Sequence, residues 1–107
     1  MIILFFLAAC GAKTSDNSTL ILNESNWDRV NVEVVITRRA DCDSHAEGYI
    51  STQQLAMRKN RTERIDVPNG ANVCWRHDRN PEQPVAGAWS GWTKASVQPG
   101  GTAEVDL

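Results

Sequence analysis

Residues 29–38 read RVNVEVVITR, and this stretch decides the fold class. Apolar side chains occupy every second position, and mostly polar ones fill the positions between them. The apolar set is Val30, Val32, Val34 and Ile36, and the alternating set is Arg29, Asn31, Glu33, Val35 and Thr37. A period of two over ten residues is typical of a β-strand with one buried face. No stretch has a sustained helical period, so we expect an all-β protein.

Further strands are expected on both sides of this one. The expected strands are residues 19–22, 48–51, 54–58, 62–67, 71–77, 88–96 and 102–107, with residues 53–60 open to a short helical turn instead. Pro68-Asn69-Gly70 predicts a hairpin between residues 62–67 and 71–77, and residues 98–101 predict another turn. About seven short strands at regular spacing favour a small antiparallel β-sandwich, immunoglobulin-like or transthyretin-like, formed by residues 19–107 as a single domain.

The first ten residues, MIILFFLAAC, are apolar throughout, and the polar stretch GAKTSDNS follows them. A membrane-spanning helix needs about 20 apolar residues, so the block fits a secretory signal peptide better. Leu7-Ala8-Ala9-Cys10 resembles the lipobox of bacterial lipoproteins. The resemblance implies a signal peptide at residues 1–9, acylation of Cys10 with a polar tether through residue 18, and, because Gly11 is not Asp, an outer-membrane location facing the periplasm. The alternative is a buried apolar strand with an incidental cysteine.

Cys42 and Cys74 remain as a pair once Cys10 is assigned to lipid. In an oxidising compartment they are expected to form a disulfide, which closes a loop of about 33 residues and contributes about 3.5 kcal/mol. The alternative uses both cysteines as zinc ligands, because each begins a C-x-x-H unit, Cys42 to His45 and Cys74 to His77. Positions three apart in a strand point to opposite faces, so we favour the disulfide and expect neither metal nor cofactor.

The chain has four tryptophans, and the residues after the apolar block contain no phenylalanine. The simplest expectation therefore places all the indoles in the core. Trp89 and Trp92 are three apart in the expected strand 88–96, which predicts one in the core and the other partly exposed beside the loop at residues 81–87. An exposed indole can stack on a sugar ring or anchor a protein, so a carbohydrate-binding or envelope-inhibitor module is an alternative function.

With 11 basic and 13 acidic residues, the net charge is −2, which excludes nucleic-acid binding driven by bulk charge. Arg58, Lys59 and Arg61 lie in a basic run that either contacts phosphates or an acidic partner or is a solvated turn. No nucleophile elbow, metalloprotease helix or phosphate loop occurs, so we expect no catalysis. The sequence predicts a small cell-envelope lipoprotein with a binding or structural role in the periplasm, its partner an envelope protein or cell-wall polysaccharide.

Overall fold

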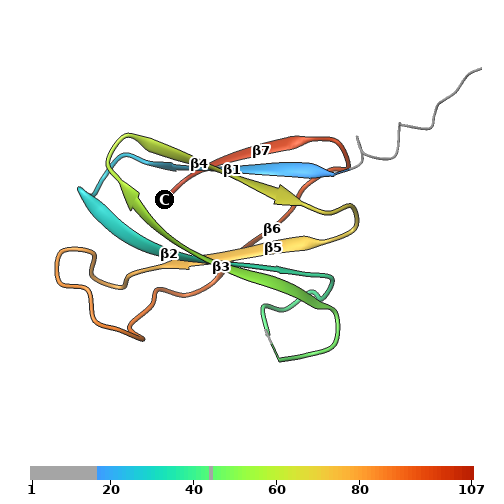
Figure 1. Ribbon diagram of the computed structural model, residues 1–107, viewed down its shortest axis with the longest axis horizontal. Helices are drawn as coiled ribbons and strands as arrows, with labels where there is room; N and C mark the ends of the chain where they lie inside the picture. Colours follow the sequence, from blue (N-terminus) through green and yellow to red (C-terminus); the bar gives the residue numbers. More distant parts are fainter. Residues whose placement is uncertain (1–16, 44) are drawn as a thin grey trace, which may run out of the picture.

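The computed structural model describes residues 17–43 and 45–107, which form seven strands and no helix (Figure 1). The expected signal peptide and Cys10 lie outside these residues. The strands are β1 (Ser18–Glu24), β2 (Arg29–Thr37), β3 (Tyr49–Arg58), β4 (Arg61–Val67), β5 (Asn72–His77), β6 (Thr93–Ser96) and β7 (Thr102–Asp106). The all-β prediction is confirmed.

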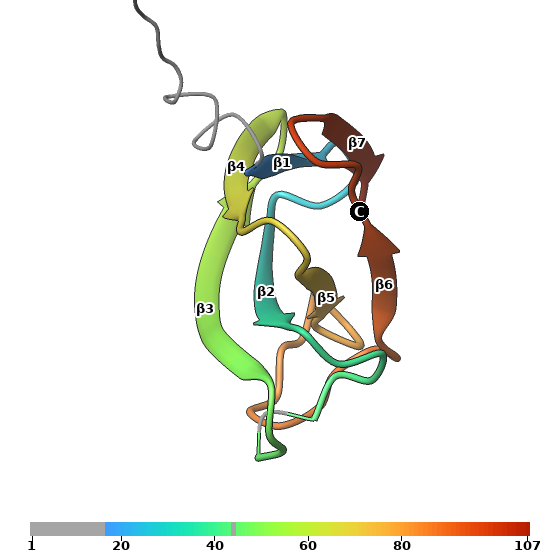
Figure 2. The same ribbon diagram turned by 90° about the vertical axis from the view of Figure 1, so that its right-hand side faces the viewer.

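Two sheets face each other as the layers of a sandwich (Figure 2). One sheet has the order β4-β1-β7, and the other has the order β3-β2-β5-β6. All pairs are antiparallel except β1 and β7, which run parallel. β1 and β7 run parallel because the chain crosses from β6 to the other sheet and enters β7 in the direction of β1.

The core lies between the two sheets and follows the alternation of β2. Val30, Val32 and Val34 are almost fully buried, as predicted. They meet Leu20 and Leu22 from β1 across the sandwich. The other buried apolar side chains of this cluster are Ile36, Met57, Ile65, Val67, Ala71, Val73 and Trp75. The alternating residues of β2 therefore point to the outer face of the four-stranded sheet.

The predicted hairpin between residues 62–67 and 71–77 is wrong. β4 pairs with β1 and β5 pairs with β2, so the two strands belong to different sheets. The turn itself forms where expected: the Ala71 amide donates to the Pro68 carbonyl at 3.0 Å, and Gly70 has a φ of +83°. This turn carries the chain from one layer to the other, which puts the buried side chains of β4 across the core from those of β5.

Two element boundaries also differ from expectation. Residues 49–58 form one strand that pairs with β2, so the helical alternative is wrong. β6 covers only Thr93–Ser96, because Trp89 joins the sheet through one isolated bridge to Asp78 and residues 90–92 are irregular. β1 begins at Ser18, the last residue of the expected tether, where the side chain is buried and its hydroxyl donates to the Gln98 carbonyl at 2.7 Å.

The Cys42–Cys74 disulfide is present, with the two Cα atoms 6.0 Å apart. Cys74 lies on β5, on the face opposite Trp75, because successive side chains of a strand alternate between its two faces. Cys42 lies in the loop after β2, so the bond fastens that loop to the outer face of the four-stranded sheet. It differs from the antibody arrangement, where a disulfide joins two sheets. Val35, directly opposite Cys74, is 2% exposed, which explains an apolar residue at an outward position.

Candidate functional site

A row of polar side chains crosses the outer face of the four-stranded sheet. Glu33 on β2 stands opposite Gln54 on β3 and opposite Arg76 on β5. Arg76 donates to Glu33 Oε1 from Nε at 2.9 Å and forms an ion pair with the same oxygen from Nη2 at 2.6 Å. Gln54 Nε2 donates to Glu33 Oε2 at 3.1 Å. We call Gln54, Glu33 and Arg76 the polar row; its members are fixed by one another.

Two indoles lie against the Arg76 end of the polar row. The guanidinium carbon is 4.3 Å from the ring centroid of Trp92 and 5.1 Å from that of Trp89. Such contacts are cation–π interactions. The prediction that one of these tryptophans fills the core is wrong, because residues 89–92 precede β6 and do not follow strand alternation. Trp75 alone of the four tryptophans is fully in the core, and Trp27 packs against it while partly exposed.

A groove of about 550 Å³ lies between the polar row and the loop before Trp89. We call it the Trp89 groove; it is lined by Asn31, Glu33, Gln54, Asp78, Trp89 and residues 84–87. Buried Asp78 accepts a hydrogen bond from the Asn31 amide at 2.8 Å and donates its own amide to the Asn31 carbonyl at 3.0 Å. The volume falls within the usual range for small-ligand sites. The groove therefore combines an indole with amide and carboxylate groups on a rigid sheet.

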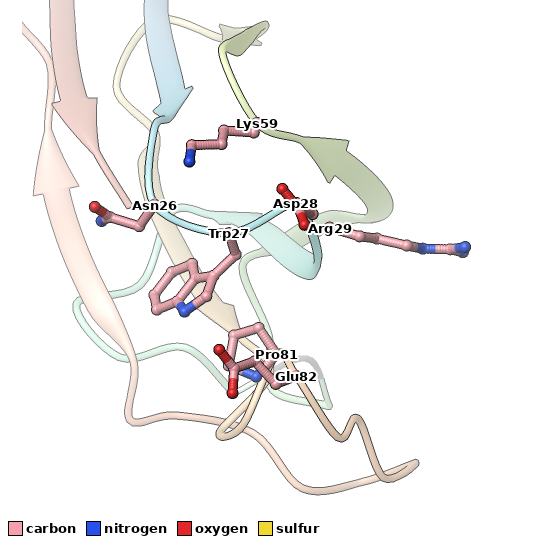
Figure 3. Close-up of a pocket in the computed structure, with 7 residues that line it drawn as sticks. All are labelled: Asn26, Trp27, Asp28, Arg29, Lys59, Pro81 and Glu82. Atoms are coloured by element: carbon pink, nitrogen blue, oxygen red, sulfur yellow. The ribbon is translucent and has the colours of Figure 1, made fainter.

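A second hollow, of about 470 Å³, surrounds Trp27 (Figure 3). In this view Lys59 lies on one side of the indole and Pro81 and Glu82 lie on the other. The buried carboxylate of Glu24 accepts hydrogen bonds from the backbone amides of Asn26 and Trp27, and these bonds fix the turn that carries the indole. The Trp27 ring lies 5.2 Å from the His77 ring, at an angle of 41° between the planes.

The two cysteines and two histidines of the zinc alternative do not form a common site. The sulfurs of Cys42 and Cys74 are bonded to each other, His77 packs against Trp27, and His45 is exposed in the loop after β2. Within residues 17–43 and 45–107, no group of three or more potential ligands is placed to hold a metal ion. The two thiolates that the alternative needs are consumed by the disulfide.

The basic residues singled out in the sequence lie at the turn from β3 to β4. Arg58 and Arg61 end and begin these strands, and Lys59 occupies the turn with Asn60, whose φ is 65°. All three basic side chains are exposed. In the part of the chain that the structure describes, the ion pairs are Arg39–Asp41 and Arg76–Glu33, so none of the three is neutralised by a carboxylate.

Asp41 is the residue whose titration is most clearly displaced. Arg39 donates to both oxygens of this carboxylate at 2.8 Å, and the Asp43 amide donates at 3.3 Å. These hydrogen bonds, together with the nearby charges of Arg39 and Lys94, lower the pKa of Asp41 to about 2. The pair lies on the disulfide-bonded loop, outside the Trp89 groove, and holds that loop's conformation.

Sequence reasoning found Trp89 and Trp92 but missed the polar row, Asn31 and the Trp27 hollow. The alternation of residues 29–38 did place Asn31 and Glu33 on the outward face, which is a usable signal for a site there. Gln54 and Arg76 come from strands whose neighbours were not predictable, so nothing local linked them to Glu33. No family model matches this chain, and comparison with curated proteins and with solved structures gave no match either. None of the described elements is a helix suited to crossing a membrane.

Proposed function

We propose that this chain is a small lipoprotein of the bacterial cell envelope whose β-sandwich binds a cell-wall polysaccharide without catalysis. The observation that carries the proposal is the Trp89 groove. Its indole offers a flat apolar surface for a sugar ring. The side-chain amides of Asn31 and Gln54 and the carboxylate of Glu33 offer hydrogen-bond partners for hydroxyl groups. Because Glu33 is held by Gln54 and Arg76, the ligand meets groups already in place.

The position of the groove supports a role at a membrane surface. The N-terminal end of β1 and the loop at residues 79–88 lie at opposite ends of the sandwich (Figure 1). An anchor on Cys10 would therefore hold the domain with the loop directed away from the membrane. For the outer-membrane location that the lipobox resemblance implies, this end faces the periplasmic cell wall. The disulfide fits the same setting, because such bonds persist outside the cytoplasm.

A protein partner is the second candidate, in keeping with an envelope-inhibitor module. Val85 and Trp92 are 64% and 36% exposed and come from the segments on either side of Trp89. Aromatic and apolar side chains of this kind are common anchors of protein interfaces. Binding of a purified envelope protein that is abolished by Val85→Asp, with no binding of glycan, would favour this candidate over the polysaccharide.

The anchoring half of the proposal is tested by acylation. In cells given a labelled fatty acid, we expect the wild-type chain to carry the label and to fractionate with membranes. Cys10→Ala should lose both properties. The double variant Cys42→Ser/Cys74→Ser is the matched control, because it removes two cysteines and should keep the label. An unlabelled wild-type chain, or a labelled Cys10→Ala chain, would show that Cys10 is not the anchor.

The binding half is tested with purified cell-wall glycan strands and the full chain in detergent. We expect saturable binding by calorimetry, with a change in tryptophan fluorescence. Trp89→Ala should weaken binding at least tenfold, as expected for loss of a stacking surface. Asp66→Asn, on the exposed face of the other sheet, is the control and should bind normally. Equal binding by both variants would show that the glycan does not bind in the Trp89 groove.

A further inference from the structure

Two arginines face each other next to the Trp89 groove. Arg29 on β2 is directly opposite Arg58 on β3, two positions before Asn31 along β2. Residues two apart in a strand point to the same face and are about 7 Å apart. Arg29 and Arg58 therefore lie on the outer face, beside the groove residue Asn31. Arg29 is one of the residues that line the Trp27 hollow, but in Figure 3 its guanidinium group extends away from Trp27.

The cross-strand pair of Arg29 and Arg58 lowers the stability of the sheet. Like charges directly opposite each other in an antiparallel pair are destabilising. Within residues 17–43 and 45–107 no carboxylate forms an ion pair with either arginine, and the nearest carboxylate on the outer face of β2, Glu33, is already bound by Arg76. Asp28 precedes Arg29 and lines the Trp27 hollow with it, but the two residues form no ion pair. The chain has more acidic than basic residues, so the two charges do not reflect a shortage of carboxylates.

We infer that the ligand of the Trp89 groove is an acidic saccharide, whose anionic group lies between Arg29 and Arg58. The inference rests on the proposed function and specifies its ligand. The sugar ring would pack against Trp89 with hydroxyl groups toward Asn31 and Gln54. The adjacent anion would accept charge-assisted hydrogen bonds from the guanidinium groups, for which carboxylate and phosphate are both suitable. Binding of the anion relieves the repulsion between the two arginines.

The test compares saccharides of equal length with and without an anionic group. Full chain in detergent is titrated with chito-oligosaccharides, which are neutral, and with equally long N-acetylglucosamine–N-acetylmuramic acid oligosaccharides, which add a lactyl carboxylate. A third arm uses a chito-oligosaccharide carrying a phosphate ester. We expect one or both acidic ligands to bind at least tenfold more tightly than the neutral one, and the better of the two identifies the anionic group. The preference should weaken as salt concentration rises.

Variants test whether the preference for acidic saccharides depends on Arg29 and Arg58. In Arg29→Gln/Arg58→Gln the acidic and neutral ligands should bind within about twofold of each other, and the melting temperature should not fall, since a repulsion is removed. Arg64→Gln, on the outer face of the other sheet, is the control and should keep the preference. Equal affinity of wild type for all three ligands, or an unchanged preference in the double variant, would overturn the inference but leave saccharide binding intact. Absence of binding to any of them would refute the proposed function itself.

Discussion

The two faces of the four-stranded sheet come from the same strands and differ completely in character. The inner face carries valines, Ile36, Met57 and Trp75 packed against the other sheet. The outer face carries the polar row, two tryptophans on Arg76, and a loop held by a disulfide. Because side chains alternate along a strand, substitutions on one face need not affect the other. The comparison indicates that the packing of the core depends on the inner face, whereas the proposed binding site lies on the outer one.

The same residue type on the two faces gives the most direct test. Trp75 is 5% exposed within the core, whereas Trp92 is 36% exposed on Arg76. Trp75→Ala should lower the free energy of unfolding by about 3–5 kcal/mol, and Trp92→Ala by less than about 1 kcal/mol. Urea unfolding of both variants measures the difference. Similar losses would mean that the outer face contributes to the stability of the fold as much as the core.

The disulfide is the outer-face feature with the largest expected effect on stability. Cys42→Ser/Cys74→Ser opens a loop with a sequence separation of 32 residues and should cost about 3.5 kcal/mol. Urea unfolding, with protease sensitivity of residues 38–48 as a second readout, measures the loss. Cys10→Ser, at the expected lipid-bearing residue outside the described part of the chain, should leave the urea midpoint unchanged. A double variant as stable as wild type would show that the loop is held without the bond.

The polar row is expected to matter more for binding than for stability. Arg76→Met removes the ion pair with Glu33 and the contact with both indoles, and should cost about 1–2 kcal/mol of unfolding free energy. It should also change tryptophan fluorescence and weaken glycan binding at least tenfold. Gln54→Glu, which sets a carboxylate beside Glu33, is a second way to disturb the row. Wild-type affinity for glycan in both variants would show that the polar row is not part of the binding site.

The smallest expected effect concerns Asp41, on the loop outside the groove. Its pKa is lowered from 3.8 to about 2, so its contribution to stability is present above pH 3.8 and is lost as pH falls through about 2. NMR titration should find the Asp41 midpoint near pH 2. Arg39→Gln should move that midpoint toward the ordinary value, because the guanidinium supplies the main hydrogen bonds. A midpoint unaffected by this substitution would show that Arg39 is not the cause.

Local patterns predicted the inner face well and the arrangement of strands poorly. The alternation of Val30, Val32 and Val34 determines which side of β2 is buried, and the Cys42–Cys74 bond followed from the cysteine count and the expected compartment. Turn chemistry at residues 68–70 does not distinguish a hairpin from a crossing between sheets, so the neighbours of β4 and β5 were missed. The polar row was missed for the same reason. Glu33, Gln54 and Arg76 come together only through the pairing of three separate strands.

β1 occupies a position with mechanical consequences. It is the central strand of its sheet, with every residue from Ser18 to Glu24 opposite β4 on one side and residues 19–23 opposite β7 on the other. A pull on the chain before Ser18 acts along this strand, nearly perpendicular to the hydrogen bonds with β4. Both ladders would then resist in shear, with many bonds loaded at once. If the proposed anchor on Cys10 holds the domain, any tension on it passes through a strand that is hydrogen-bonded on both sides.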